Sequence, residues 1–238
     1  MSQEPAVIDV GDGVHQDNSL DRAALLALES AVQTAIAQAR PILFRPACVG
    51  RFFSAGMNLP DLMQRPDEEV RRTFGTLLSL TRCIFRAPVP VATAASGHAV
   101  GLGAILVLVA DYAAMSPSGK LRFPEATLGL PLFTDIASIL RYRSDARTAE
   151  RMLLEAEPFG AEEALARGLI AASDPEPLDR AHAWLNRPAT LECNAVATLK
   201  DQCRSGVCVA SPDKQVDEFM RHWGSEVAQQ RMSDLCNR

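Results

Sequence analysis

Residues 97–131 read GHAVGLGAILVLVADYAAMSPSGKLRFPEATLGLP, and this stretch decides how the rest of the chain is interpreted. Glycine has no Cβ, so Gly97, Gly101 and Gly103 allow the backbone to turn and to approach a neighbouring segment closely. The apolar run 104–110 that follows is long enough for a buried helix beginning at these glycines. The first N–H groups of such a helix have no partner within it and lie at its positive end. Such donors can hold a carbonyl oxygen as it gains negative charge.

Glu125 follows in the same stretch, between apolar neighbours that include Phe123, Pro124 and Leu128. Apolar surroundings raise the pKa of a carboxyl group toward that of a useful base. The stretch therefore predicts an oxyanion hole and one carboxylate. Each part has a structural alternative, because glycines often serve close packing and a lone glutamate in a loop is usually a solvated surface charge. The functional interpretation therefore needs a second, independent part of the site, contributed by another stretch of the chain.

Composition indicates an ordinary globular protein. The chain has 238 residues, of which 47% are hydrophobic and 22% are charged, which allows one or two domains with a sizeable core. A net charge of −5 without a basic cluster argues against nucleic acid as a partner. The start, Met-Ser-Gln-Glu-Pro, lacks the basic-then-apolar order of a secretion signal, and the longest apolar run is too short for a membrane span. We expect a cytoplasmic protein without membrane contact.

Six cysteines are scattered along the chain without the pairing of a metal site. The closest two have four residues between them, and no histidine lies near enough to complete a zinc pattern. We expect reduced thiols and no metal. The cysteines are Cys48, Cys83, Cys193, Cys203, Cys208 and Cys236.

Hydrophobic periodicity predicts strands alternating with helices, which is typical of a parallel sheet with crossover helices. The segment 67–85 is a convincing amphipathic helix, which Pro88 and Pro90 end. We expect strands at 6–10 (an edge strand), 41–44, 52–59 (running into a glycine turn) and 89–94. We expect further helices at about 20–39, 136–142, 148–155, 161–168 (stopped by Gly168) and 215–234.

The two glycine turns, considered together, resemble those of the crotonase (enoyl-CoA hydratase/isomerase) superfamily. The matching landmarks occur in order and at the expected separations over roughly residues 18–172. They are Asn18-Ser19-Leu20, 53–59 (FSAGMNL), 97–103 (GHAVGLG), Asp111, Pro124-Glu125, Leu128-Gly129-Leu130, 161–164 (AEEA) and Gly168-Leu169-Ile170.

The resemblance implies an α/β fold, the crotonase-like (ClpP/crotonase) spiral of ββα units. Residues 1–175 would form the core domain, and 176–238 would form a C-terminal helical region through which the family assembles as trimers or as dimers of trimers. We therefore expect a homotrimer or a hexamer.

The resemblance also implies the site. The family holds the thioester oxygen of an acyl-CoA with two backbone N–H groups, which here would be those of Met57 and Leu102. Glu125 would be the catalytic carboxylate. Ala55, Gly56, Gly101, Ile105, Leu130 and Phe133 would line the substrate pocket.

One departure from the family pattern decides the predicted chemistry. Hydratases of the family carry a second glutamate twenty positions before the one that corresponds to Glu125, and this chain has Ile105 there. A single glutamate resembles the family's Δ3,Δ2-enoyl-CoA isomerases, in which one base removes a proton from C2 and returns it at C4. We expect no cofactor, because coenzyme A or a carrier-protein phosphopantetheine would enter as part of the substrate.

Other polar residues carry weaker predictions. Asp135 is a possible second acid in the pocket, although an aspartate at a helix start is more often a cap. His98 is interpreted as a hydrogen-bonded structural residue, and Asn58 as fixing its turn. Asp111 fits a structural role after the buried helix. Arg82 and Arg86 lie near the end of a helix, where a solvated face is the default.

Three alternatives remain open at this point. The first is a hydratase or thioester hydrolase of the same family that uses Glu125 and Asp135. The second is a tailoring isomerase of polyketide or fatty-acid biosynthesis acting on a carrier-protein thioester, because no cations for the phosphates of free CoA can be identified. The third is a binding subunit that kept the fold without the chemistry.

Overall fold

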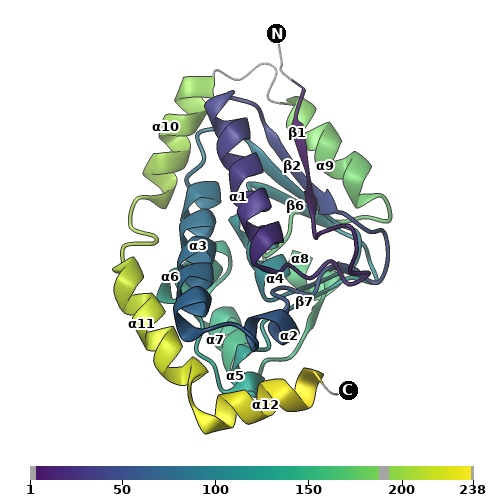
Figure 1. Ribbon diagram of the computed structural model, residues 1–238. Helices are drawn as coiled ribbons and strands as arrows, with labels where there is room; N and C mark the ends of the chain where they lie inside the picture. The colour runs from purple at the N-terminus through teal and green to yellow at the C-terminus, as the bar shows by residue number, and fades with distance from the viewer. Residues whose placement is uncertain (1–3, 188–192, 237–238) are drawn as a thin grey trace.

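A parallel sheet of five strands runs through one half of the molecule in the computed structural model, which describes residues 4–187 and 193–236 (Figure 1). Residues 1–3, 188–192 and 237–238, which include the start of the N-terminal segment and parts of the expected C-terminal region, lie outside the described residues. The strand order is β1-β2-β4-β6-β9, so the strand at 6–10 is at the edge, as expected. The strands are β1 Ala6–Val10, β2 Ile42–Pro46, β4 Val91–Ala95, β6 Tyr112–Met115 and β9 Ala172–Ser173.

A second, four-stranded sheet has the order β3-β5-β7-β8, in which only the β7–β8 pair is antiparallel among the described strands. The chain passes from the first sheet to the second three times, as β2–β3, β4–β5 and β6–β7, and a helix follows each passage. This repeat is the spiral of ββα units that the resemblance implied. The strands are β3 Phe52–Ser54, β5 His98–Val100, β7 Lys120–Arg122 and β8 Phe159–Gly160.

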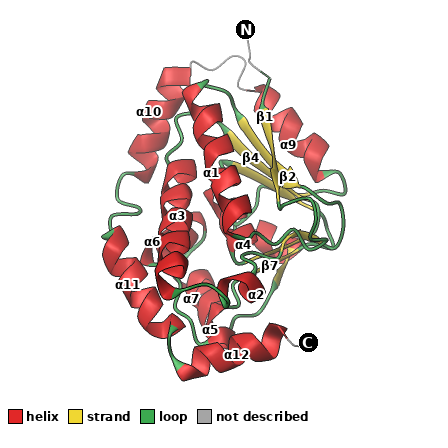
Figure 2. Cartoon of the chain, in the orientation of Figure 1, coloured by secondary structure: helices red, strands yellow, loops and turns green. Residues whose placement is uncertain are grey.

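Helices cover both faces of the large sheet (Figure 2). Helix α9 packs on β4 and β6, where Trp184 stacks on Tyr112, and α1 and α3 lie on the opposite side. The helices are α1 Arg22–Ala37, α2 Leu59–Leu62, α3 Asp67–Phe85, α4 Leu102–Val109, α5 Glu125–Leu128, α6 Thr134–Arg143, α7 Ala146–Leu154, α8 Ala161–Ala166, α9 Pro177–Asn186, α10 Cys193–Arg204, α11 Pro212–Trp223 and α12 Glu226–Cys236.

Helix α4 is the centre of the core, and all of its residues are buried. The apolar run predicted this helix, which begins at Leu102, two residues before the run itself. Arg143 caps its C-terminal end, because its guanidinium donates to the carbonyl oxygens of Leu108 at 2.9 Å and Ala110 at 2.5 Å. A cation at this end opposes the negative pole of the helix and stabilises the C-terminal end of α4.

Helices α11 and α12 pack on the same core as the first 175 residues, and polar contacts attach α10. Asp111 binds Lys200 at 2.8 Å and Arg204 at 2.6 Å, which attaches α10 to the end of α4. Helix α11 packs on α3, and α12 packs on α5 and α2. The helical segment expected at 215–234 contains parts of two helices, because the chain turns at Gly224 and Ser225. Assembly through this region stays a prediction.

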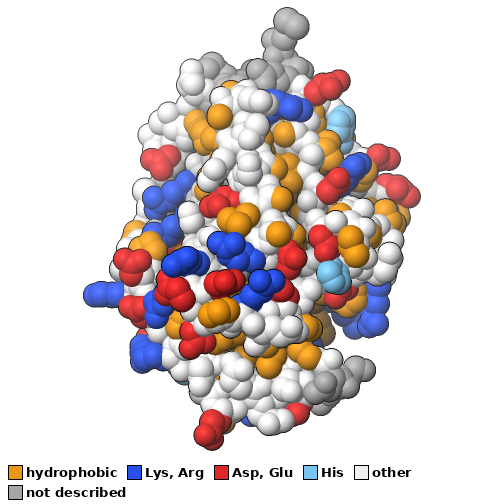
Figure 3. Space-filling model, in the orientation of Figure 1, with side chains coloured by type: hydrophobic (Ala, Val, Ile, Leu, Met, Phe, Trp, Pro, Cys, Tyr) orange, Lys and Arg blue, Asp and Glu red, His pale blue; other side chains and the backbone are white. Residues whose placement is uncertain are grey.

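The surface mixes charges of both signs. Figure 3 shows positive and negative side chains interspersed on one face. Exposed ion pairs include Arg72–Glu68 on α3 and Arg65–Asp61 between the end of α2 and the turn before α3. None of the helices built from the described residues combines the length and the apolar character that crossing a bilayer requires. Five cysteines, Cys48, Cys83, Cys203, Cys208 and Cys236, are free thiols.

Candidate active site

The two glycine turns meet at the start of α4. Gly56 has φ +95° and Gly101 has φ +52°, both in the region that favours glycine. A Cβ at Gly56 would lie 2.9 Å from the carbonyl oxygen of Val100 and 3.3 Å from the amide nitrogen of Leu102. A side chain at position 56 would therefore push the two turns apart.

Two further glycines bring the turns together by close packing. A Cβ at Gly97 would lie 2.5 Å from the carbonyl oxygen of Arg51, and one at Gly103 would lie 2.5 Å from that of Ser54. Since real Cβ atoms do not approach so closely, both positions require glycine. Close packing was the structural alternative to a functional role, and here it is what places the segment 54–57 against the start of α4.

The amides of Met57 and Leu102 are available as donors. Leu102 is the first residue of α4, so its N–H has no acceptor within the helix. Leu20 makes a parallel bridge to Met57, in which Leu20 donates to the oxygen of Gly56 and Asn58 donates to the oxygen of Leu20. In the described part of the chain, neither the Met57 nor the Leu102 amide donates to a loop, turn or side chain.

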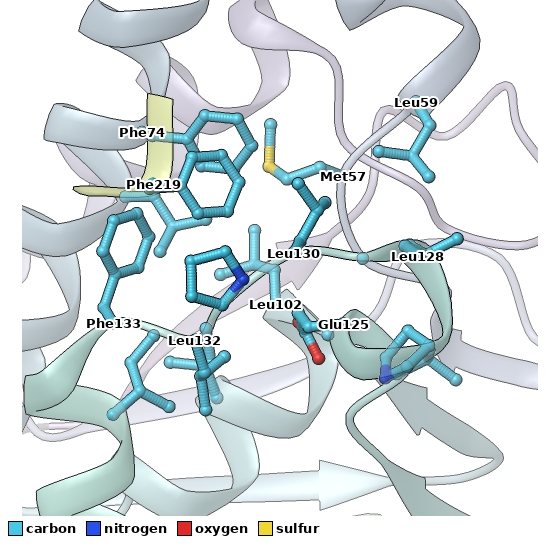
Figure 4. Close-up of a pocket in the computed structure, with 18 of the residues that line it drawn as sticks. Met57, Leu59, Phe74, Leu102, Glu125, Leu128, Leu130, Leu132, Phe133 and Phe219 are labelled. Atoms are coloured by element: carbon cyan, nitrogen blue, oxygen red, sulfur yellow. The ribbon is translucent and has the colours of Figure 1, made fainter. Parts of the chain in front are cut away.

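A cavity opens beside the two turns, and Figure 4 shows its lining. It encloses about 610 Å³ with its open mouth included. Met57, Leu102 and Glu125 all line it. The six residues expected in the pocket also line it: Ala55, Gly56, Gly101, Ile105, Leu130 and Phe133.

Glu125 is the first residue of α5, and its carboxyl group faces the cavity. A Cβ at Gly101 would lie 3.8 Å from Oε1 of Glu125, so the carboxyl group lies close to the second glycine turn. Part of the residue is accessible, but Oε2 is buried and has no hydrogen-bond partner in the described structure. Burial raises the pKa of Glu125 from an ordinary 4.5 to about 7, against the smaller opposing effects of its own backbone amide and of the Arg122 charge.

Ile105 occupies the position that, by the resemblance, corresponds to the second glutamate of the hydratases. It is one turn into α4, where its N–H donates to the oxygen of Gly101 at 2.9 Å, and its side chain is 3% exposed. Of the described residues that line the cavity, Glu125 alone carries an ionisable side chain. The remaining lining side chains are apolar, so an ordered water there would have few side-chain partners.

Asp135 does not line this cavity in the described structure. Its carboxylate Oδ2 lies 2.5 Å from Nε of Arg82, and its backbone N–H donates to Gln215 at 3.0 Å. Position 133 precedes the helix, so Asp135 lies inside α6 and is not its cap. The buried pair joins α6 to α3 and to the start of α11.

Of the two arginines near the end of α3, Arg82 is partly buried, contrary to the expected solvated face, whereas Arg86 is exposed, as expected. Arg82 pairs with Asp135 and donates to the oxygen of Ala210, while Arg86 donates to the oxygens of Val207 and Cys208. The carbonyl acceptors are more than 100 residues away in the sequence and Asp135 is 53 residues away, so no local pattern could indicate them.

Three other polar residues were predicted to be structural. Asn58 caps α2 by accepting from the amide of Asp61, and Asp111 holds α10 while also accepting from Val91. The expectation of a hydrogen-bonded His98 was wrong, because its Nδ1 is buried without a partner and its ring lies edge-on to Phe52 at 5.4 Å.

Sequence reasoning missed the aromatic side of the cavity. Phe74 of α3, Phe219 of α11 and Leu132 all line it. In Figure 4, Phe74, Phe133 and Phe219 gather on the left side of the view, away from Leu128 on the right. Phe74 belongs to the predicted buried face of α3, but periodicity does not distinguish a core position from a pocket wall.

The comparisons with known proteins agree with this geometry. The family described as enoyl-CoA hydratase/isomerase matches residues 15–230. A probable enoyl-CoA hydratase of Rhodobacter capsulatus is 32% identical over 179 residues, which are 73% of this chain and 66% of that protein. The mitochondrial enoyl-CoA hydratase domain-containing protein 3 of Danio rerio is 30% identical over 171 residues, 71% of this chain and 55% of that protein. The chain therefore spans only about half to two thirds of these relatives.

Solved structures share the fold. A crystal structure of an enoyl-CoA hydratase/isomerase from Mycobacterium paratuberculosis has a TM-score of 0.83 and 20% identity, covering 96% of this chain and 93% of that one. Identity at this level supports the architecture alone. The family match over most of the chain, the spiral of ββα units and the paired glycine turns lead to one conclusion: the chain belongs to the enoyl-CoA hydratase/isomerase family, in the crotonase superfamily.

Proposed function

We propose that this protein is an enoyl-thioester isomerase, which moves a carbon–carbon double bond between the Δ3 and Δ2 positions. The observation that carries the proposal is the cavity lining, in which Glu125 is the single ionisable side chain among the described residues. Shifting a double bond needs one base and no added water, whereas hydration needs a second group to hold and activate water.

The oxyanion hole would consist of the amides of Met57 and Leu102. As a base removes the proton from C2, negative charge develops on the thioester oxygen, and two preoriented N–H groups stabilise that charge. Each such donor is worth about 3 kcal/mol in comparable sites. The donors belong to backbone segments fixed by the contacts of Gly56, Gly97 and Gly103, so little reorganisation is needed.

Glu125 would carry the proton. As a carboxylate it accepts the proton from C2, and the electron pair delocalises over the thioester oxygen and C4. As a carboxylic acid it then donates the same proton to C4, which leaves the double bond between C2 and C3. A pKa of about 7 suits both steps, because the ionised and the protonated forms are then similar in energy near neutral pH.

The substrate would be an acyl-CoA or a carrier-protein thioester, and no cofactor takes part in this scheme. An apolar acyl chain fits the lining, since Leu102, Ile105 and Leu130 face the cavity.

Hydration of an enoyl thioester is the second candidate, because the relatives from Rhodobacter capsulatus and Danio rerio carry hydratase in their names. Two observations weigh against it. Ile105 stands at the position of the second glutamate, and Asp135 is paired with Arg82 outside the cavity.

One experiment separates the two reactions. A 3-enoyl-CoA is incubated with the protein in water enriched in ¹⁸O, and the products are followed by absorbance of the conjugated 2-enoyl thioester and by mass spectrometry. The isomerase proposal expects the conjugated product without ¹⁸O. Absence of the conjugated product from the 3-enoyl-CoA, together with an ¹⁸O-carrying 3-hydroxyacyl product when a 2-enoyl-CoA is supplied in its place, would reject it in favour of hydration.

A further inference from the structure

A second cavity lies next to the one that holds Glu125. It encloses about 580 Å³ with its open mouth included, and its lining is more polar. Ser211, Lys214, Gln215 and Glu218 contribute from the segment that begins α11, and Thr134 contributes from the start of α6. None of these five polar residues lines the Glu125 cavity.

Four residues line both cavities and therefore separate them. They are Pro131, Leu132, Phe133 and Phe219, which we call the shared wall. Two of the four are aromatic, and their rings stack with centroids 5.1 Å apart at an interplanar angle of 27°. Figure 4 shows Phe133 and Phe219 on the same side of the Glu125 cavity.

Two further aromatic rings, those of Phe74 and Trp223, pack against the aromatic part of the wall. The ring of Phe74 lies 4.2 Å from that of Phe219 and 6.1 Å from that of Phe133. Trp223 contacts Phe74 at 5.7 Å and Phe219 at 6.2 Å. Phe219 and Trp223 are 4% and 2% exposed, so the wall belongs to the packed core and has little space to move.

The helix that carries Phe219 is also held by polar contacts. Gln215 accepts from the backbone of Asp135, Arg82 donates to the oxygen of Ala210 just before α11, and Arg71 pairs with Asp217. The Arg82–Asp135 pair thus holds the start of α6 close to α11, and the wall is supplied by residues 131–133, just before α6, and by Phe219 of α11. These polar contacts position the helix and take no part in the chemistry at Glu125.

We propose that Phe133 and Phe219 close the far end of the substrate pocket and limit the enzyme to thioesters with short, apolar acyl chains. The proposal rests on the proposed function, because it assumes that the acyl chain lies in the cavity with its reacting carbons at Glu125. A longer chain would meet the stacked rings before it could reach the second cavity and solvent. Without the ring of Phe219 the two cavities would join.

The test compares short and long substrates. Turnover is measured with four- and six-carbon and with twelve- and sixteen-carbon 3-enoyl-CoA, and affinity is measured separately by calorimetry with the saturated acyl-CoA of each length. Binding of a saturated chain needs no catalysis. The variants are Phe219→Ala, Phe219→Leu and Phe133→Leu, each checked for folding by circular dichroism.

The matched control is Trp223→Phe. Trp223 packs against Phe74 and Phe219 but lines neither cavity, so this change perturbs the same cluster without opening the wall. We expect the unchanged protein to favour short chains by about tenfold or more in kcat/KM and in affinity, a typical discrimination for a few carbon atoms in an apolar pocket. Phe219→Ala should raise the long-to-short ratio by about tenfold, with smaller rises for the leucine variants, and Trp223→Phe should leave it within about twofold.

Several results would overturn the proposal. The first is equal turnover and equal binding of short and long chains by the unchanged protein. The second is a long-to-short ratio that stays unaltered in the wall variants. The third is a change of that ratio in Trp223→Phe as large as in the wall variants. Should Phe219→Ala not fold, the chain-length profile of the unchanged protein and the leucine variants still decide. If the wall variants shift the affinity ratio but the protein isomerises no substrate, the proposed function is rejected and the role of the wall stands. If the protein isomerises short and long substrates equally well, the proposed function stands and the role of the wall is rejected.

Discussion

Replacement of Glu125 by glutamine is expected to remove catalysis and, above neutral pH, to stabilise the fold. The carboxyl oxygen Oε2 is buried and has no hydrogen-bond partner among the described residues, and burial raises the pKa of Glu125 from an ordinary 4.5 to about 7. The folded protein thus opposes the ionised form, which is the form that acts as a base. Active sites commonly retain such groups at the expense of stability.

The size of the effect and its pH range follow from the two pKa values. Below pH 4.5 the carboxyl group is protonated in the folded and the unfolded chain, so it costs nothing. As the pH rises from 4.5 to about 7, the carboxyl group ionises in the unfolded chain, where it is hydrated, but stays protonated in the folded chain, so the balance shifts toward the unfolded chain. Since one pKa unit corresponds to about 1.4 kcal/mol, ionised Glu125 destabilises the fold by up to about 3 kcal/mol above neutral pH.

The assay is urea unfolding of the unchanged protein and of Glu125→Gln at pH 5 and at pH 8.5. We expect the variant to be more stable by about 1 kcal/mol or less at pH 5 and by about 2–3 kcal/mol at pH 8.5. Glu157→Gln, which changes an exposed glutamate, is the control and should show no such difference. Equal stabilities of the Glu125 variant and the unchanged protein at both pH values would refute the assignment of a raised pKa to burial.

Three further outcomes are expected. The kcat/KM for a 3-enoyl thioester should fall about tenfold per pH unit below pH 7 and level off above it, because the base must be ionised; a flat profile between pH 5 and 7 would contradict the raised pKa. Gly56→Ala should lower kcat by about a hundredfold, because its Cβ would lie 2.9 Å from the oxygen of Val100 and would part the two turns; near-normal kcat would contradict this. Asp111→Ala should destabilise the protein by about 3–5 kcal/mol in thermal or urea unfolding, since it leaves Lys200 and Arg204 as buried unpaired cations, and a loss under about 1 kcal/mol would contradict this.

Local patterns predicted much of the fold. Helix α3 has the predicted bounds, 67–85, because its apolar face repeats at helical spacing and prolines follow it. The edge strand at 6–10 was also predicted with its observed bounds. The segment 215–234 was predicted to be helical, and it contains parts of two helices, because Gly224 ends α11 and a new helix begins at Glu226.

Long-range contacts explain the differences that remain. Arg82 and Arg86 donate hydrogen bonds to backbone oxygens of the segment 207–210. Asp135 pairs with Arg82, which lies 53 positions earlier in the sequence. Phe219 reaches the cavity only because α11 folds back on α3. Such pairings depend on the tertiary path of the chain, and a single sequence carries no local signal for them. The placing of Glu125 beside the glycine turns could be predicted, because the resemblance spans both turns.

The central claim is that one buried carboxylate moves a proton from C2 to C4 of a polarised thioester. Its most direct test is a single turnover of a 3-enoyl-CoA carrying deuterium at both C2 hydrogens, with the position of the label in the 2-enoyl product read by nuclear magnetic resonance. We predict that part of the deuterium appears at C4, because Oε2 of Glu125 is buried away from water. Complete loss of that label to solvent, or formation of a hydroxyacyl product instead, would contradict the account.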